Sequence, residues 1–268
     1  MDLRPPEWIN LAAMAVFAAL ALVRTMDPKA RASVLALAAL GAAATVCGLR
    51  AHEWWGRPTG DALRDWLPVV LILVPYWQAG QFDRHPSAAL EKRFLDWDHR
   101  RLSVLLAAVR QRPWVGRYLE TAYLLFYTLN PLALAVLYWT RNTWYVDKFW
   151  LWVLPPTYLC YVLLPFVQTR PPRALGNESP PQAARSVNLW LLDSLSIQVN
   201  TFPSCHVVAS LAAAAAMLEV VPLAGVLFLW AAFSVAAGAV LGRYHYLADA
   251  AAAALLVAAH GAVLAAWR

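Results

Sequence analysis

The chain has 268 residues, of which 61% are hydrophobic and only 14% are charged. Soluble domains carry about 25% charged residues, so this composition excludes a soluble enzyme, a disordered regulator and a secreted disulfide scaffold. The 14 Trp and 10 Tyr residues are typical of a protein whose helix ends lie at two membrane interfaces. The net charge of +6 fits basic loops beside anionic lipid headgroups, and no basic run with interleaved aromatic residues indicates nucleic-acid binding.

Eight apolar stretches approach the length of about 20 residues that a helix needs to cross a membrane. In chain order they are approximately 8–23, 32–49, 66–79, 118–139, 149–167, 207–221, 223–241 and 246–267. The third is short and contains Pro68 and Pro75. Only Val221-Pro222 separates the sixth from the seventh, which predicts a tight helical hairpin. The predicted fold class is therefore all-α, a polytopic membrane bundle of about eight spans.

Two polar segments divide this pattern. We expect residues 1–60 to form a two-helix membrane extension and residues 61–268 to form a six-helix core. Within the core, residues 81–117 mix charged residues with Leu and Trp at helical spacing, which predicts one or two amphipathic helices on the membrane surface. Residues 168–202 are rich in proline at both ends. Ordered loops of this length usually have a function, so we expect an active-site loop here.

The first chemical candidate is the segment Thr169-Arg170-Pro171-Pro172-Arg173, directly after the fifth stretch. Ionisable groups at membrane depth cost about 2.5–3.5 kcal/mol, so those that border the spans are the first candidates for function. Two guanidinium groups at a rigid helix exit match the geometry of phosphate oxygens. Taken alone, the segment fits equally well two interfacial anchors that contact lipid headgroups.

A second candidate, Pro203-Ser204-Cys205-His206, opens the sixth stretch. Proline suits the first turn of a helix, and the free N–H groups of that turn bind anions. The segment therefore predicts an anion site with a histidine in its first turn. One alternative is a capped helix start with an incidental histidine. The other is a nucleophilic Ser204 or Cys205, which is disfavoured because adjacent side chains on a helix point in different directions.

The third candidate lies around Arg243, His245 and Asp249, where the last stretch begins. His245 and Asp249 are four residues apart and so share one helix face. A carboxylate in this position can hold the imidazole in one tautomer and stabilise its charged form, as in a catalytic triad. The alternative is a structural pair in which the two side chains satisfy each other.

An unbroken alternation of spans brings all three candidates to one membrane face. Arginines, two histidines and an aspartate together are the inventory of a metal-free phosphoryl-transfer site. The chemical alternative is a metal site at His206, His245 and Asp249, which the clustered arginines disfavour because they repel a cation. The three cysteines form no CxxC pair, so they predict neither a disulfide framework nor a zinc site. No cofactor is expected.

At these residues the sequence resembles the type-2 phosphatidic acid phosphatase superfamily of membrane lipid phosphatases and phosphotransferases. The family pattern has a Lys and an Arg-Pro, then Pro-Ser-Gly-His, then an Arg with a downstream His-x-x-x-Asp. Arg170-Pro171, Pro203-Ser204-Cys205-His206 and His245-Tyr246-Leu247-Ala248-Asp249 match these blocks in order. The resemblance covers roughly residues 66–267, and the first two helices resemble an extension.

The resemblance implies that His245 attacks phosphorus to form a phosphohistidine, with Asp249 orienting it, while His206 protonates the leaving alkoxide. Water, or a lipid or polyol hydroxyl, then releases the phosphoryl group. The implied partners are a lipid phosphate in the bilayer and, for transfer, an alcohol or lipid acceptor. The residues expected to hold the phosphate oxygens are Arg170, Arg173, Ser204, Cys205 and Arg243.

The sequence departs from the family pattern at three places. Leu163 and Phe166 occupy the candidate positions of the first-block Lys, and Cys205 replaces the Gly. Ala239 occupies the expected place of the third-block Arg, for which Arg243 is the candidate substitute. The local motif forms are similar to those of the inositol phosphorylceramide synthase branch, whose members transfer a phosphorylated headgroup between lipids. A phosphodiester carries less charge than a phosphomonoester, which agrees with fewer cations.

These observations favour an integral membrane lipid phosphatase that acts on a lipid or prenyl phosphate. The alternatives are a phosphotransferase that moves a headgroup such as inositol phosphate, and a non-catalytic lipid-binding or transport protein. The Ala- and Arg-rich composition fits a bacterial cell membrane. Most of the 22 Lys and Arg residues fall on the face of the candidate site, and the positive-inside tendency would place that face in the cytoplasm. The resemblance favours the outer face.

Overall fold

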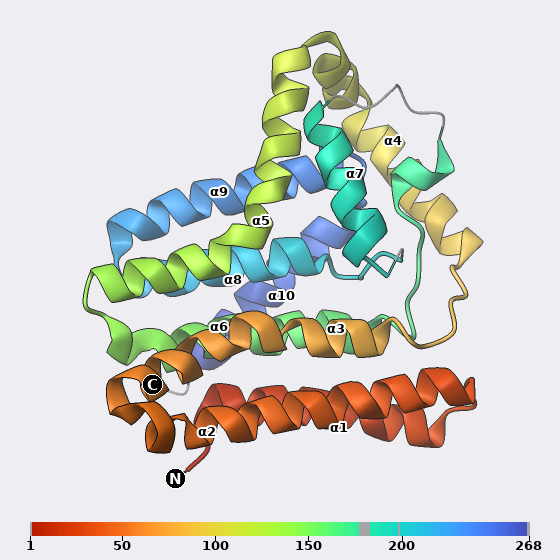
Figure 1. Cartoon of the computed structure of the whole chain (residues 1–268). Helices are drawn as coiled ribbons and strands as arrows, with labels where there is room; N and C mark the ends of the chain where they lie inside the picture. The colour runs from red at the N-terminus through yellow and green to blue at the C-terminus, as the bar shows by residue number, and fades with distance from the viewer. Residues whose placement is uncertain (1, 177–182, 198, 267–268) are drawn as a thin grey trace.

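A computed structural model of the chain describes residues 2–176, 183–197 and 199–266, so parts of the predicted loop 168–202 and the end of the last stretch lie outside the described residues. The described residues form helices without a β-strand, which confirms the predicted all-α bundle. Figure 1 shows that the long apolar helices run side by side. The helices are α1 (Pro5–Val23), α2 (Pro28–Leu71), α3 (Leu73–Ala79), α4 (Ala88–Gln111), α5 (Pro113–Trp139), α6 (Val146–Leu163), α7 (Ala183–Leu195), α8 (Cys205–Val220), α9 (Pro222–Leu241) and α10 (Leu247–Ala266).

Helix α2 reverses its direction at Gly56, where φ is +77°. Only glycine adopts this conformation without strain. The two arms then pack against each other closely: a Cβ added to Gly60 would lie 2.4 Å from His52 Cδ2, and one added to Gly48 would lie 3.1 Å from Leu67 Cδ2. The two arms and α3 account for the second and third predicted stretches.

Among the residues that the structure describes, five helical segments are long and apolar enough to cross a membrane: Pro5–Val23, Pro28–Ala79, Pro113–Trp139, Pro222–Leu241 and Leu247–Ala266. The chain is therefore an integral membrane protein. Helix α8 is also apolar but has 16 residues. The predicted hairpin at Val221-Pro222 is confirmed, because α8 and α9 meet there and a Cβ added to Gly225 would lie 2.5 Å from Leu218 Cα.

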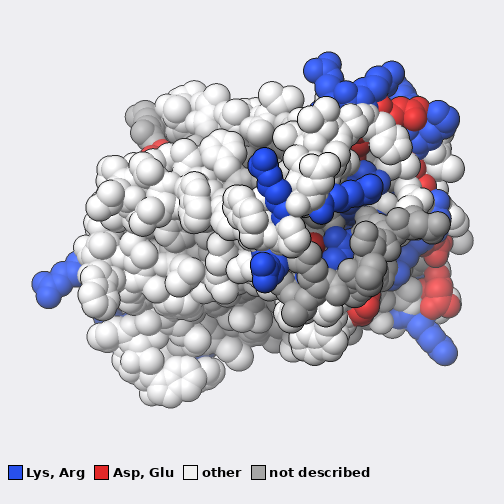
Figure 2. Space-filling view, turned by 90° about the horizontal axis from the view of Figure 1, so that it is seen from above, with Lys and Arg blue, Asp and Glu red and all other residues white. Residues whose placement is uncertain are grey.

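The predicted amphipathic segment forms one helix, α4, at the right-hand end of the bundle in Figure 1. Ser87 caps its N-terminus by accepting a hydrogen bond from the Leu90 N–H. Figure 2 shows charged side chains gathered at this end of the molecule, while the remainder of that face is mostly uncharged. A charged end beside a long apolar body is what a bundle with one polar interface requires.

The N-terminal hairpin is joined to the core at the opposite end by one buried and two partly buried ion pairs. Arg64 and Glu7 pair at 2.6 Å with side chains 6% and 3% exposed. Arg4 contacts Asp65 at 2.6 Å and Asp147, at the start of α6, at 2.5 Å. These contacts fix α1 and α2 against α6, so residues 1–60 pack on the core instead of lying apart from it.

Candidate active site

Backbone hydrogen bonds hold the three candidate segments together. The Asn200 N–H donates to the Thr169 carbonyl at 2.9 Å, which joins the segment after α6 to the segment before α8. The Ser204 N–H donates to the Asp249 carbonyl at 3.1 Å, and the Arg173 N–H donates to the Arg243 carbonyl at 3.0 Å. The structure thus brings the three motif blocks to one place near the charged end of the bundle.

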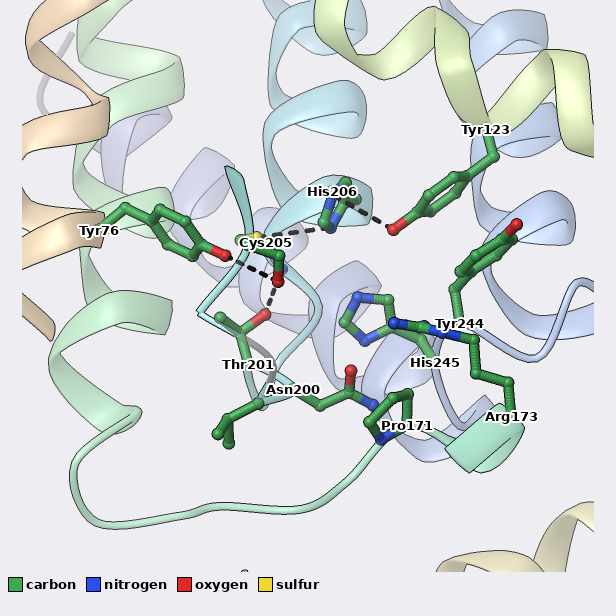
Figure 3. A pocket seen from close by; sticks show the side chains of 12 residues that line it. Tyr76, Tyr123, Pro171, Arg173, Asn200, Thr201, Cys205, His206, Tyr244 and His245 are labelled. Carbon is green, nitrogen blue, oxygen red and sulfur yellow. Dashed lines mark hydrogen bonds between the residues drawn. The ribbon is translucent and has the colours of Figure 1, made fainter. Parts of the chain in front are cut away.

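A polar cavity of about 30 Å³ lies between these segments. Of the predicted site residues, it is lined by Arg173, Cys205, His206 and His245 (Figure 3). The other lining residues are Tyr76, Tyr123, Pro171, Ser196, Val199, Asn200, Thr201 and Tyr244.

His245 lies at the wall of this cavity with Asp249 behind it. His245 Nδ1 is 3.1 Å from Asp249 Oδ2, and both side chains are buried. The same carboxylate oxygen accepts the Tyr246 N–H at 3.0 Å, which fixes its position in the first turn of α10. A proton on Nδ1 that is donated to Asp249 leaves the Nε2 lone pair as the nucleophile.

His206 lies across the cavity in the first turn of α8. Its ring centroid is 5.4 Å from that of His245. Its Nε2 lies 3.3 Å from the Tyr123 hydroxyl, and its Nδ1 lies 3.5 Å from Cys205 Sγ. Both histidines therefore border the same space. The Cys205 thiol thus contacts the His206 ring, although the two side chains are adjacent in sequence.

Arg173 reaches the cavity from the turn Pro172–Leu175. Its guanidinium lies over the Tyr244 ring, with Cζ 5.0 Å from the centroid. The Tyr244 ring stacks on Tyr123 at 4.3 Å, and its hydroxyl donates to Glu120 Oε2 at 2.5 Å. This cation–π contact holds the Arg173 guanidinium at the wall of the cavity that the two histidines also line.

Arg170, which the resemblance implies for phosphate binding, is engaged by helix α4. Its Nη2 and Nε donate to Glu91 of α4 at 2.8 and 3.1 Å, and its backbone N–H donates to the same carboxylate at 2.8 Å. These hydrogen bonds lower the pKa of Glu91 below its ordinary value. Arg170 does not line the polar cavity. It joins α4 to the first motif block.

Ser204 and Arg243 also lie outside the cavity lining. Ser204 occupies the N-cap position of α8, but its buried Oγ makes no hydrogen bond among the described residues. The Cys205 N–H donates to Thr201 Oγ1 at 3.0 Å, and the Ser204 N–H is already paired, so two N–H groups at this helix start are occupied. Arg243 adopts a positive φ of 64° in the turn before His245.

No motif in the sequence identifies several of the residues that line the cavity. Asn200 and Thr201 belong to the long loop before α8, and the buried Asn200 Nδ2 has no hydrogen-bond partner among the described residues. Tyr123 and Tyr76 come from α5 and α3, whose apolar sequences show only membrane spans. No group of three or more His, Cys, Asp and Glu side chains is placed to hold a metal within the part of the chain that the structure describes.

The fold and site together define a class of protein: a helical integral membrane protein with two histidines and an arginine at one buried polar cavity. Residues 91–263 match the sequence model of the PAP2 superfamily, and this chain belongs to that superfamily. Membership makes it a phosphatase-type membrane enzyme in general terms. Among curated proteins and among solved structures, none matches this chain.

Proposed function

We propose that the chain hydrolyses the phosphate ester of a lipid through a phosphohistidine. His245 Nε2 attacks phosphorus, and the bond between phosphorus and the lipid oxygen breaks. The leaving alkoxide takes a proton from the His206 ring. Water then attacks the phosphohistidine, giving its proton to His206, and the phosphorus–nitrogen bond breaks to release phosphate and free His245. Arg173 balances the negative charge of the phosphoryl oxygens.

The arrangement that carries this proposal is the His245–Asp249 pair, opposite His206 across one cavity. A carboxylate behind a nucleophilic histidine stabilises the charge that the ring gains as it bonds to phosphorus. A second histidine on the other side of the same space can serve the leaving oxygen. Metal independence is part of the proposal, since Arg173 supplies the positive charge.

Phosphate release by the purified protein in detergent, with EDTA present, tests the proposal. The substrate panel contains phosphatidic acid, phosphatidylglycerophosphate, prenyl diphosphates and phosphoinositides. We expect release that survives chelation, is abolished by His245→Ala, and falls by about 10⁴-fold in Asp249→Asn. His99→Ala, at an exposed histidine on α4, is the matched control. Full activity of His245→Ala, or activity that disappears with EDTA, contradicts the proposal.

Headgroup transfer is the second candidate, and one observation favours it. Arg173 is the only predicted arginine that lines the cavity among the described residues, since Arg170 is engaged by Glu91. A phosphodiester has less charge to balance than a phosphomonoester. Adding acceptor alcohols distinguishes the two reactions: a new phospholipid indicates transfer, and free phosphate indicates hydrolysis.

A non-catalytic lipid-binding protein is the third candidate. Its lipid binding would survive His245→Ala, and no product would form with any substrate or acceptor.

A further inference from the structure

Glu120 of α5 carries a buried carboxylate that the proposed reaction does not use. The Tyr244 hydroxyl donates to its Oε2 at 2.5 Å, and the Asn188 amide donates to the same oxygen at 2.7 Å. Arg185 Nη1 donates to Oε1 at 3.2 Å. Because burying a charged group is costly unless it is hydrogen-bonded, these three donors fix the carboxylate in place. An ionisable residue in a membrane-spanning helix is also a first candidate for function.

The Tyr244 ring connects Glu120 with the polar cavity. One face of the ring stacks on Tyr123, with centroids 4.3 Å apart and planes inclined by 5°. This leaves the other face to the guanidinium of Arg173, whose Cζ lies 5.0 Å from the ring centroid. Figure 3 shows Arg173 and Tyr244 beside His245. The position of the Arg173 charge in the cavity wall thus depends on where the Tyr244 ring is held.

A second guanidinium lies near the same ring. Arg185 of α7 has its Cζ 5.7 Å from the Tyr244 centroid. Two guanidinium groups beside one ring repel each other, and the Glu120 carboxylate, which is paired with Arg185, offsets this repulsion. Removing the charge of Glu120 therefore weakens the hold on the ring and leaves Arg173 beside a cation that is no longer balanced.

Glu120 also attaches α7 to α5. Asn188 Nδ2 of α7 donates to the Glu120 backbone carbonyl at 2.9 Å as well as to its carboxylate, and Figure 1 shows α7 beside α5. Glu120 thus has two connections, one to the cavity through Tyr244 and one to α7 through Asn188. Substitution of each partner tests the two connections separately.

We propose that Glu120 is a positioning residue of the phosphoryl-transfer site: it holds the Tyr244 ring, and through that ring the Arg173 guanidinium, beside the two histidines. Glu120 does not line the polar cavity, so it acts through Arg173 and not on the substrate. The proposal rests on the proposed function, in which Arg173 balances the charge of the phosphoryl oxygens.

Glu120→Gln keeps the shape of the side chain and removes its charge. We expect kcat/KM for a lipid phosphate to fall about ten- to hundredfold. Because Glu120 acts through Arg173, adding Glu120→Gln to Arg173→Ala should lower kcat/KM no further. Glu219→Gln is the matched control, since that carboxylate also accepts a tyrosine hydroxyl, from Tyr145 at 2.7 Å, and does not line the cavity. Losses that multiply in the double variant would overturn the proposal.

The reactivity of Arg173 toward phenylglyoxal, an arginine-specific reagent, tests the contact without turnover. Mass spectrometry of the modified protein in detergent gives the rate of reaction at each arginine. We expect Arg173 to react severalfold faster in Glu120→Gln and in Tyr244→Phe than in the wild type, because its guanidinium is released from the ring. Arg110, which is exposed on α4, should react at the same rate in every variant.

Asn188→Ala separates positioning of Arg173 from attachment of α7. This variant removes the contact with α7 and keeps the hydrogen bond between Glu120 and Tyr244, so Arg173 should react at the wild-type rate. Unchanged reactivity of Arg173 in Glu120→Gln, or an equal rise in Asn188→Ala, overturns the proposal. Because the measurement needs no substrate, either result stands whether or not the protein releases phosphate, which its own assay decides.

Discussion

Arg170 and Glu91 form a two-pronged ion pair, with Nη2–Oε2 at 2.8 Å and Nε–Oε1 at 3.1 Å. The glutamate side chain is 4% exposed and the arginine 51%. The pair joins the amphipathic helix α4 to the first motif block, and Tyr246 adds a hydrogen bond from its hydroxyl to the Arg170 carbonyl at 2.9 Å. An arginine expected to bind phosphate is thereby engaged in positioning the segment that carries Arg173.

This geometry predicts different roles for the two arginines. Arg173→Ala should lower kcat/KM for a lipid phosphate about 10²- to 10³-fold, because it removes a charge from the cavity. Arg170→Ala should have a smaller effect, and Glu91→Ala should reproduce it. Steady-state kinetics of the single variants and of the Arg170/Glu91 double variant measure this. If Arg170→Ala were as damaging as Arg173→Ala while Glu91→Ala had full activity, Arg170 would act on phosphate directly.

The contact of α4 with α10 should depend on pH through Asp98. Burial raises the pKa of Asp98 from 3.8 to about 6, and its Oδ1 accepts the Leu247 N–H at the start of α10. A carboxyl group with a raised pKa in the folded protein adds stability below its unfolded pKa and loses it as pH rises to about 6. The Tm difference between wild type and Asp98→Asn in detergent should therefore fall between about pH 4 and pH 6. A constant difference would contradict this.

The contribution of Glu91 to stability should change with pH in the opposite direction. Its pair with Arg170 lowers its pKa below the ordinary 4.5, so the stability it adds is present above pH 4.5 and is lost as pH falls through the lowered pKa. Thermal melts of wild type and Glu91→Gln from pH 7 down to pH 3 test this, and a Tm difference that grew on acidification would disprove it.

Removing the charge of one partner in the buried pair Arg64–Glu7 should lower the stability of the protein strongly. Glu7→Gln leaves an uncompensated guanidinium in the protein and should destabilise it by about 3–5 kcal/mol. The comparison is Glu53→Gln in the surface pair Arg50–Glu53, whose side chains are 61% and 56% exposed and where we expect less than about 1 kcal/mol. Thermal unfolding in detergent distinguishes the two variants. Similar Tm values would mean that the buried pair adds little.

Labelling of a cysteine placed on α4 can determine on which side of the membrane the site lies. Following the family resemblance, we expect the site face to be the outer face of a bacterial cell membrane. His99→Cys, introduced with Cys47→Ser to remove the exposed native cysteine, should then react with a membrane-impermeant maleimide in intact cells. Labelling only after permeabilisation would place the site in the cytoplasm, as the distribution of Lys and Arg indicates.

Much of the bundle follows from the sequence, because apolar length and proline position are local properties. The hairpin at Val221-Pro222 and an amphipathic helix at α4 are examples. The convergence of His206, His245 and Asp249 also follows, since helix alternation sets which ends meet. The partner of Arg170 could not be predicted: Glu91 lies 79 residues away, and only the tertiary packing of α4 selects it among the acidic residues of that segment.

The aromatic and polar cavity walls were missed for a related reason. In an apolar helix, Tyr123 or Tyr76 has the same sequence signature whether it faces lipid, core or substrate. Glu120 is read as an ordinary polar residue of a span until its neighbours are known. Spacing identifies reactive groups that share one turn, such as His245 and Asp249, but not groups that meet across the bundle.

The reversal at Gly56 returns the chain through the second arm of α2 to α3, which delivers Tyr76 to the wall of the polar cavity, and Leu73 and Val70 to the wall of a neighbouring apolar cavity. These residues precede position 91, where the superfamily match begins. The motif residues and part of the cavity walls thus come from separate stretches of the chain. Replacing residues 28–79 with another hairpin would therefore change the shape of the cavity walls and leave every motif histidine and arginine of the sequence unchanged.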